Sequence, residues 1–416
     1  MGKSLFQPCN ILLPKTDSYE KWSVIACDQF TSEPQYWEQT RNEIGNCKST
    51  LDLILPEAYL SKDNSESICA IHDTMNRYLS EDSFKIIENS FIYVERTLLN
   101  GDIRPGLIGV IDLEEYSYDK GMESRIRPSE KTVVERIPPR KMVRENAPIE
   151  MPHIILFYND EEDRFTSFIQ KRKSALKEVY DFDLIMGGGH ISGWAIQGKD
   201  ADKINELFSS YQIYIEDECS KHGLNPMILA VGDGNHSLAT AKDCWEGLKK
   251  QLPKEKWENH PARYAMVEIE NIYDKSMQFE PIHRIVQNVN TDDLLEYLQN
   301  TICCENGYPI QWHRQDESGF LYLNVQDGEL PLAVFHDALD KWLNDHPGNI
   351  DYIHGEQSLL KLAEQKNTVG FLMPEIDKSQ FFMDIMQNGV LPRKTFSLGL
   401  SQEKRYYLEV RKILCD

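Results

Sequence analysis

The segment from Met227 to Leu252 carries the clearest change of hydrophobic pattern in the chain. A continuous apolar run ends at Val231, a polar turn follows, and apolar side chains then recur at helical spacing at Leu238, Ala241, Trp245, Leu248 and Leu252. The run predicts a buried strand, and the recurrence predicts a helix with one apolar face. Gly232 and Gly234 allow a sharp turn and a close approach to a ligand. Because the first turn of a helix favours anions, this segment predicts a phosphate-binding loop.

Strand-like and helical patterns alternate along the rest of the chain, which predicts an α+β fold of mixed sheets with flanking helices. Strands are predicted at 22–27, 91–98, 107–116, 154–158, 194–196, 262–269 and 320–325, and helices at 34–44, 165–179, 201–223 and 294–302. A chain of 416 residues exceeds the size at which a single core stops growing. We therefore expect two intimately packed lobes, an α/β lobe over 1–286 and an α+β lobe over 287–416.

Composition and charge narrow the class of protein. Hydrophobic residues make up 41% and charged residues 27% of the chain, as in ordinary globular proteins. The formal net charge of -22 argues against nucleic acid as a partner, because a polyanion is bound by neutralising its phosphates. The sequence shows neither a membrane-spanning run nor a signal peptide, and its nine cysteines lack a C-x-x-C pair. These features predict a cytoplasmic protein with reduced cysteines.

The loop itself, Gly232-Asp233-Gly234-Asn235-His236-Ser237, is neither a Walker A loop nor a dinucleotide-binding fingerprint. His236 supplies a proton donor that an ordinary turn does not require. The alternative is that Asp233 and Asn235 only cap the helix and shape the turn.

Four short motifs, in this order along the chain, resemble those of the family catalogued as domain of unknown function 1015. The loop resembles the family's D-G-H-H-R signature, and three later segments resemble P-x-H-R, Y-x-H and M-P-x-K-S-T-x-F: Pro281-Ile282-His283-Arg284, Asp351-Tyr352-Ile353-His354 and Leu391-Pro392-Arg393-Lys394-Thr395-Phe396. This resemblance covers nearly the whole chain and adds His283 and Arg284 to the candidate phosphate-binding residues. Asn235 and Ser237 stand where the family usually has His and Arg, so the loop lacks an arginine.

The same loop is similar to the phosphate loop of the sulfiredoxin and ParB superfamily, which includes ADP-dependent free-serine kinases. This resemblance implies a ParB/sulfiredoxin-like core and the handling of nucleotides or phosphoesters. In those kinases a carboxylate accepts the proton of the attacking hydroxyl, and Asp28, at the end of the predicted strand 22–27, is the position for that role here. The alternative for Asp28 is a turn residue that bonds to local backbone.

A basic segment over residues 125–144 stands out in the acidic chain. Arg136 and Arg140 could neutralise a bound phosphate, since arginine forks match phosphate oxygens. The alternative is a solvated face, or ion pairs with the acidic remainder of the chain.

Together these features predict an enzyme that transfers a phosphoryl group to a small hydroxy amino acid such as serine. Asp28 would be the base, His236 would donate to phosphate, and the loop from Gly232 to Ser237 would hold the phosphate. Mg²⁺ with ADP or ATP is expected from polyphosphate chemistry, and Asp233 could help hold the ion. Two alternatives stay open: a phosphatase acting on small molecules such as phosphoserine, and a sensor that binds its ligand without turnover. The substrate, the nucleotide and the oligomeric state stay open as well.

Overall fold

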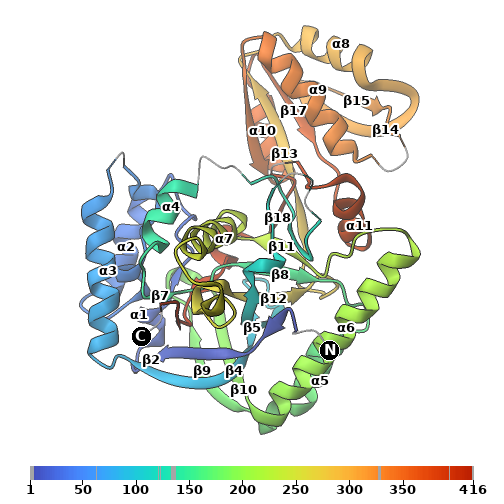
Figure 1. The fold of residues 1–416 in the computed structure, drawn as a ribbon. Coiled ribbons are helices and arrows are strands. Elements are labelled where there is room, and N and C mark those ends of the chain that lie inside the picture. The colour runs from blue at the N-terminus through green and yellow to red at the C-terminus, as the bar shows by residue number, and fades with distance from the viewer. Residues whose placement is uncertain are drawn as a thin grey trace. The chain divides into compact units, whose positions relative to one another are not determined.

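The computed structural model describes residues 4–61, 63–119, 121, 123–132, 137–326, 329–392 and 394–414. The chain divides into two compact units (Figure 1). Unit 1 comprises Met1–Pro128, Thr132–Met277 and Leu400–Asp416, and unit 2 comprises Ser129–Lys131 and Gln278–Gly399. The division therefore falls before the predicted boundary at 286/287. The C-terminal segment, which was predicted to belong to the second lobe, is part of unit 1.

Unit 1 is built on a mixed sheet. Its strands are β1 (Phe6–Gln7), β2 (Cys9–Pro14), β4 (Phe84–Thr97), β5 (Ile103–Asp112), β6 (Ile126–Pro128), β8 (Ile155–Tyr158), β9 (Lys177–Asp183), β10 (His190–Ile196), β11 (Leu229–Asp233) and β12 (Tyr264–Asn271). The order is β6-β11-β8-β12-β5-β4-β10-β9, with β1 added to β5 and β2 to β4. β6 runs parallel to β11 and β8 parallel to β12, whereas β8 and β11 are antiparallel. This mixture of directions, with helices around it, confirms the predicted α+β class.

Helices and two short strand pairs complete unit 1. The helices are α1 (Tyr19–Trp22), α2 (Pro34–Ile44), α3 (Ser65–Ser80), α4 (Ile137–Arg144), α5 (Arg164–Arg172), α6 (Gly198–Lys221) and α7 (Asn235–Lys249). β3 (Val24–Ile25) pairs with β19 (Tyr406–Tyr407), and β7 (Ile149–Glu150) pairs with β20 (Arg411–Lys412). The segment after residue 400 is therefore held in unit 1 by strand pairing with two earlier parts of the chain.

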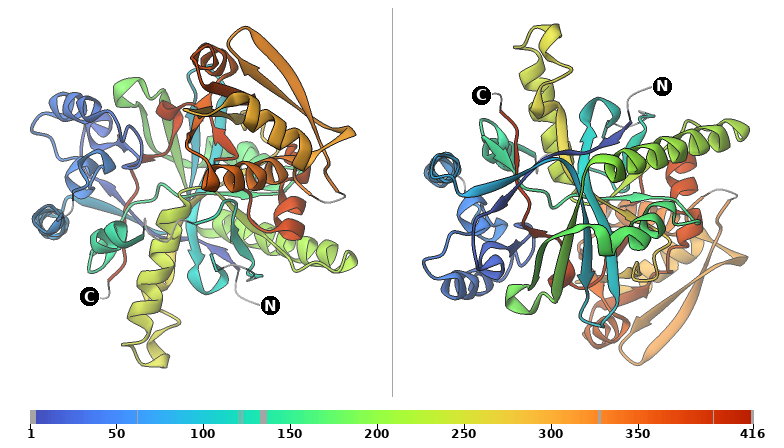
Figure 2. Two further views of the ribbon diagram at one scale, coloured as in Figure 1. Left: turned by 90° about the horizontal axis from the view of Figure 1, so that it is seen from above. Right: turned by 90° about the horizontal axis from the view of Figure 1, so that it is seen from below.

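The predicted strand and helix around the glycine loop are present as β11 and α7. The first residues of β11, Leu229 to Val231, are fully buried, as expected for a continuous apolar run. Figure 2 shows α7 running outward from the sheet, with its N-terminal end at the sheet. α4 and α7 pack against each other.

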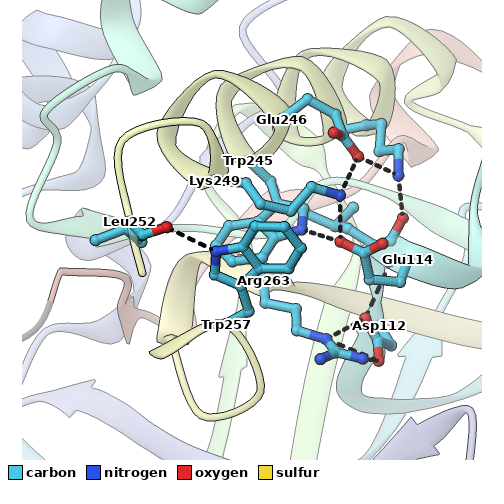
Figure 3. A network of polar contacts seen from close by, with 10 residues as sticks. Asp112, Glu114, Trp245, Glu246, Lys249, Leu252, Trp257 and Arg263 are labelled. Carbon is cyan, nitrogen blue, oxygen red and sulfur yellow. Dashed lines mark hydrogen bonds and ion pairs between the residues drawn. The ribbon is translucent and has the colours of Figure 1, made fainter. Parts of the chain in front are cut away.

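Contacts on the C-terminal half of α7 fix the direction of this helix (Figure 3). Trp245 Nε1 donates to Glu114 Oε1 at 2.5 Å, and Lys249 Nζ lies 2.8 Å from the same oxygen. Glu114 follows β5, whose last residue, Asp112, pairs with Arg263 at 2.6 Å. The C-terminal half of α7 is thus tied to the segment that follows a central strand.

Two predicted elements differ from the structure. The helix predicted over 165–179 ends at Arg172, and residues 177–183 form β9, which pairs with β10. The strand predicted over 22–27 is reduced to β3, because Trp22 closes the short helix α1. In the first case, strand pairing across the turn at 187–189 overrides a local pattern that also fits a helix.

Unit 2 contains a second sheet, covered by helices. Its strands are β13 (Phe279–Gln287), β14 (Cys303–Arg314), β15 (Glu317–Leu323), β16 (Asn349–His354), β17 (Thr368–Leu372) and β18 (Phe396–Leu398), and its helices are α8 (Thr291–Ile302), α9 (Pro331–Asp345), α10 (Glu356–Ala363) and α11 (Lys378–Asn388). The order is β15-β14-β17-β13-β16, with β18 added to β13. Its core includes Phe335, Leu339 and Trp342 of α9 and Phe371 of β17.

Candidate active site at the start of helix α7

The turn between β11 and α7 contains a negatively charged side chain, the carboxylate of Asp233. Gly234 takes a left-handed conformation with φ 79°, which glycine adopts without strain, and α7 begins at the next residue. The Gly234 N–H donates to Asp233 Oδ1 at 2.8 Å. The N–H groups of Ser237 and Leu238 both donate to the Gly234 carbonyl at 3.0 Å. The Asp233 carboxylate therefore lies next to the helix N-terminus without capping it, and a phosphate bound there would lie close to this negative charge.

Gly232 has a structural role that differs from the predicted one. A Cβ at this position would lie 2.4 Å from Cζ of Phe157, which is far inside van der Waals contact. A glycine is needed at position 232 because the Phe157 ring of β8 packs over the backbone of β11. This packing explains the glycine without a bound ligand. The neighbouring Asn235 has a buried side-chain oxygen that, within the described part of the chain, has no hydrogen-bond partner.

Lys404 places a positive charge at this turn. Its Nζ lies 3.2 Å from Asp233 Oδ2, and the side chain is only 15% exposed. Lys404 precedes β19 in the C-terminal segment of unit 1. The loop from Gly232 to Ser237 contains no lysine or arginine, so Lys404 supplies a cation that the loop itself lacks.

Asp28 belongs to the same cluster of charges. It follows β3, is partly buried, and accepts a hydrogen bond from the Gln29 side chain at 3.0 Å. Burial raises the pKa of Asp28, but nearby His153, the Gln29 hydrogen bond, Arg140 and Lys404 together lower that pKa below its usual value. The structure thus brings Asp28 into the electrostatic environment of the α7 turn, and the carboxylate is ionised at neutral pH.

His153 connects the turn to a buried hydrogen-bonded network, which we call the His153 network. Its Nε2 lies 2.8 Å from Ser237 Oγ and its Nδ1 lies 3.0 Å from the Tyr407 hydroxyl, which in turn donates to Cys27 Sγ at 3.1 Å. Burial lowers the pKa of His153, although Asp28 and Asp233 act in the opposite direction. Burial also raises the pKa of the Cys27 thiol to about 12. Both groups are therefore neutral at neutral pH.

A cavity of about 140 Å³ opens beside the His153 network. Its polar end is formed by Cys27, His153, Ser237 and Tyr407. Its walls are mostly apolar and come from α3, α4 and the segments around them: Leu53, Ile54, Leu55, Leu60, Met75, Val143, Ala147, Ile149, Met151, Ile154 and Met266. We refer to this space as the apolar cavity.

The basic segment is largely occupied by ion pairs. Arg140 forms an ion pair with Glu57, Lys141 Nζ lies 2.7 Å from Asp243, and Arg144 lies 2.5 Å from Glu150. Arg125 lies 2.7 Å from Glu115. The structure therefore favours the alternative of ion pairs with acidic residues from elsewhere in the chain. Arg140 also lines the apolar cavity, whereas Arg136 lies outside the described residues.

The structure assigns the remaining predicted site residues to different places. His236 lies in the first turn of α7 and is partly buried, and its carbonyl accepts a hydrogen bond from Thr240 Oγ1 at 2.7 Å. His283 and Arg284 lie on β13 in unit 2, where both are buried. His283 Nδ1 accepts from the Met373 N–H at 3.2 Å, and Arg284 Nε donates to His336 at 2.9 Å. These two residues thus take part in the internal packing of unit 2.

The described residues contain no set of side chains arranged as ligands of a metal ion. Among them, no group of three or more His, Cys, Asp or Glu side chains is arranged to hold an ion. Asp233, the residue predicted to help hold Mg²⁺, is paired with Lys404.

Sequence comparison assigns the family. A model of the family described as protein of unknown function (DUF1015) matches residues 7–412, and the chain therefore belongs to this family. The resemblance predicted from the four motifs is confirmed. No curated protein matches the chain. In the part of the chain that the structure describes, no helix is both long and apolar enough to cross a membrane.

Several solved structures are similar to this chain at low sequence identity. A free serine kinase in complex with ADP shares 10% identity at a TM-score of 0.37, over 73% of this chain and 91% of that chain. SbnI with a C-terminal truncation, from Staphylococcus aureus, shares 11% identity at a TM-score of 0.36, over 70% and 83%. A conserved hypothetical protein from Pyrococcus furiosus shares 11% identity at a TM-score of 0.33, over 73% and 94%.

Proposed function

We propose that unit 1 is a phosphotransferase that binds a nucleotide at the N-terminal turn of α7 and transfers a phosphoryl group to the hydroxyl of a small molecule. The observation that carries this proposal is the convergence of Asp28, Asp233 and Lys404. Lys404 lies 3.2 Å from Asp233 and also lowers the pKa of Asp28. A lysine and a helix N-terminus stabilise phosphoryl oxygens, and an ionised carboxylate accepts a proton.

The roles follow from this arrangement. The acceptor oxygen forms a bond to phosphorus while the bond between phosphorus and the bridging oxygen of the nucleotide breaks. The proton of the acceptor hydroxyl passes to Asp28, and the shortened nucleotide leaves with the bonding electrons. Lys404 and the first turn of α7, including His236, stabilise the negative charge on the transferred group. The free serine kinase neighbours that carry AMP or ADP supply the nucleotides to test first.

Product analysis tests the proposal. The protein is incubated with ADP or ATP and with L-serine or other small alcohols, and ³¹P NMR follows the appearance of a phosphomonoester. We expect Asp28→Asn to lower turnover by at least a hundredfold while the melting temperature stays near that of the wild type, because the amide cannot accept the proton. Asp17→Asn, at an exposed aspartate, is the matched control. Full activity of Asp28→Asn would refute the assigned role.

Hydrolysis is the second candidate function, and the His153 network favours it. Ser237 Oγ lies 2.8 Å from a neutral imidazole beside the proposed phosphate position. A water bound beside Ser237 would replace the acceptor hydroxyl. Release of inorganic phosphate without an acceptor, in the same ³¹P NMR experiment, would distinguish hydrolysis from transfer.

A further inference from the structure

We propose that the apolar cavity binds the organic part of the acceptor, and that this acceptor is an uncharged alcohol with an apolar body. This inference rests on the proposed function and replaces serine with a more specific class of substrate. It follows from three features of the cavity: its walls, its charges and the direction of the hydrogen bonds at its polar end.

The walls of the cavity set the size and polarity of the ligand. Most of the lining side chains are aliphatic or methionine, including Leu53, Met75, Val143 and Met151. Such walls stabilise carbon atoms removed from water and offer no partners to a zwitterion. A volume of about 140 Å³ is close to that of engineered cavities that hold benzene, so the body of the ligand has about six carbon atoms.

The charged residues in the wall come as pairs. Arg140 is paired with Glu57, and Arg144 lies 2.5 Å from Glu150. Arg411 also lies 2.5 Å from Glu150, and the ionised Asp28 interacts with Arg140, so the wall and its immediate surroundings hold three positive and three negative charges. His153 is neutral because burial lowers its pKa. The wall therefore provides no surplus charge to balance a carboxylate or an ammonium group on the ligand. Burial of an unbalanced charge is costly, and this favours an uncharged ligand.

The His153 network determines which polar group the ligand presents. Tyr407 has a single hydroxyl hydrogen, which it donates to Cys27 Sγ. The Tyr407 oxygen must then accept from His153 Nδ1–H, so Nε2 is unprotonated and accepts from the Ser237 hydroxyl. The lone pairs of Ser237 Oγ are left to accept a hydrogen bond. In the bound state, an alcohol that donates its O–H to Ser237 Oγ completes this network, and the same proton passes to Asp28 only in the transfer step of the proposed function.

Calorimetric titration with a series of straight-chain alcohols tests this inference on the full-length protein. From 1-propanol to 1-hexanol, affinity should rise about threefold to fourfold for each added methylene, because each is buried against the apolar wall. Hexyl methyl ether, which lacks a donor, should bind at least tenfold more weakly than 1-hexanol. L-Serine should give no saturable heat. ADP is titrated separately, so that binding at the α7 turn is measured independently.

Two substitutions on α4 locate the binding. Val143→Phe fills the cavity and should weaken 1-hexanol binding by at least tenfold, whereas Met142→Phe, at the neighbouring exposed position, should leave it unchanged. Ser237→Ala should remove the preference for 1-hexanol over the ether. If Val143→Phe does not fold, this loss of preference tests the site without it.

The outcomes separate the two proposals. If ADP binds and none of the alcohols does, the inference is overturned while the proposed function stands. Equal binding of 1-hexanol to the wild type and to folded Val143→Phe would also overturn it, because the alcohol would then lie elsewhere. If the alcohols bind as described and ADP does not, the cavity assignment holds and the proposed function fails.

Discussion

The surroundings of Glu270 disfavour the ionised form of its carboxyl group. It lies on β12, only 3% exposed, and one of its oxygens has no hydrogen-bond partner among the described residues. Burial raises the pKa of Glu270 to about 8, and the neighbouring Glu268 adds to the effect while Arg104 opposes it. At neutral pH the native protein therefore holds a proton here that the unfolded chain releases.

This buried proton predicts a loss of stability in alkaline solution. Between the unfolded pKa near 4.5 and the folded pKa of about 8, the native state binds more protons than the unfolded state, so the free energy of unfolding falls as the pH rises. From pH 6 to pH 9 we expect a loss of about 2 to 3 kcal/mol from this group. Urea denaturation at several pH values measures it. Glu270→Gln should remove most of this slope, and Glu258→Gln, at an exposed glutamate, should keep it.

The residues of the candidate site were predictable only where a local pattern marked them. The glycine loop and Asp28 stand at the ends of apolar runs, and this position in the sequence was enough to single them out. No local sequence pattern marks His153, Tyr407 or Lys404. Tyr407 and Lys404 join the site because β19 pairs with β3, and His153 joins it because β8, which it precedes, pairs with β11. Long-range pairing of this kind leaves no periodic signal in a single sequence.

At the scale of elements, the junction of β11 with β8 explains the glycine at position 232. The Phe157 ring of β8 covers the backbone of β11, and this close approach leaves no room for a side chain. Gly232, which the sequence pattern assigns to the approach of a ligand, therefore belongs to the packing between two strands. Gly234 differs, since its left-handed backbone conformation is what starts α7.

We expect Gly232→Ala to destabilise unit 1 by about 1 to 3 kcal/mol, the usual cost of forcing a methyl group into a packed core. Phe157→Leu combined with Gly232→Ala should lose less than the sum of the two single variants, because the smaller side chain leaves space for the new Cβ. Gly247→Ala on α7 is the control. A Cβ there meets no atom within 4 Å, and the change should stabilise the helix by about 0.5 to 1 kcal/mol. Urea denaturation of the four variants decides the matter, and an unaffected Gly232→Ala would contradict the packing explanation.

Elements were predicted well where hydrophobic periodicity was long and unambiguous. α6 and α7 lie within a few residues of their predicted bounds, as do β8 and β12. The helix predicted over 165–179 extends too far, into the first residues of β9, because the apolar residues at its end fit either periodicity and pairing with β10 decided the outcome. Short elements such as α1 and β3 are set by the packing of Trp22 against the rest of unit 1, which no local pattern records.

At the scale of the whole molecule, unit 1 is closed by the last segment of the chain. Trp22 Nε1 donates to the Leu408 carbonyl at 2.9 Å, and Arg405 Nε lies 2.8 Å from Glu268. Leu408 and Val410 are fully buried. The lobe predicted over 1–286 lacks these contacts, since the sequence pattern gives no sign that the chain returns to its first unit after residue 399.

A fragment of residues 1–286 should therefore fail to fold cooperatively. Without residues 400–416 the fragment would expose the surface that covers Tyr406, Tyr407 and Leu408, and Glu268 would stay buried without Arg405. Together these changes should lower the free energy of unfolding by several kcal/mol, which is a large part of the stability of an ordinary domain. Near-ultraviolet circular dichroism and thermal unfolding are the measurements. Fusing residues 400–416 to the fragment through a flexible linker should restore a single sharp transition, whereas an unrelated segment of equal length should not. If the fragment alone already unfolds in one cooperative transition, the C-terminal segment is not the element that completes unit 1.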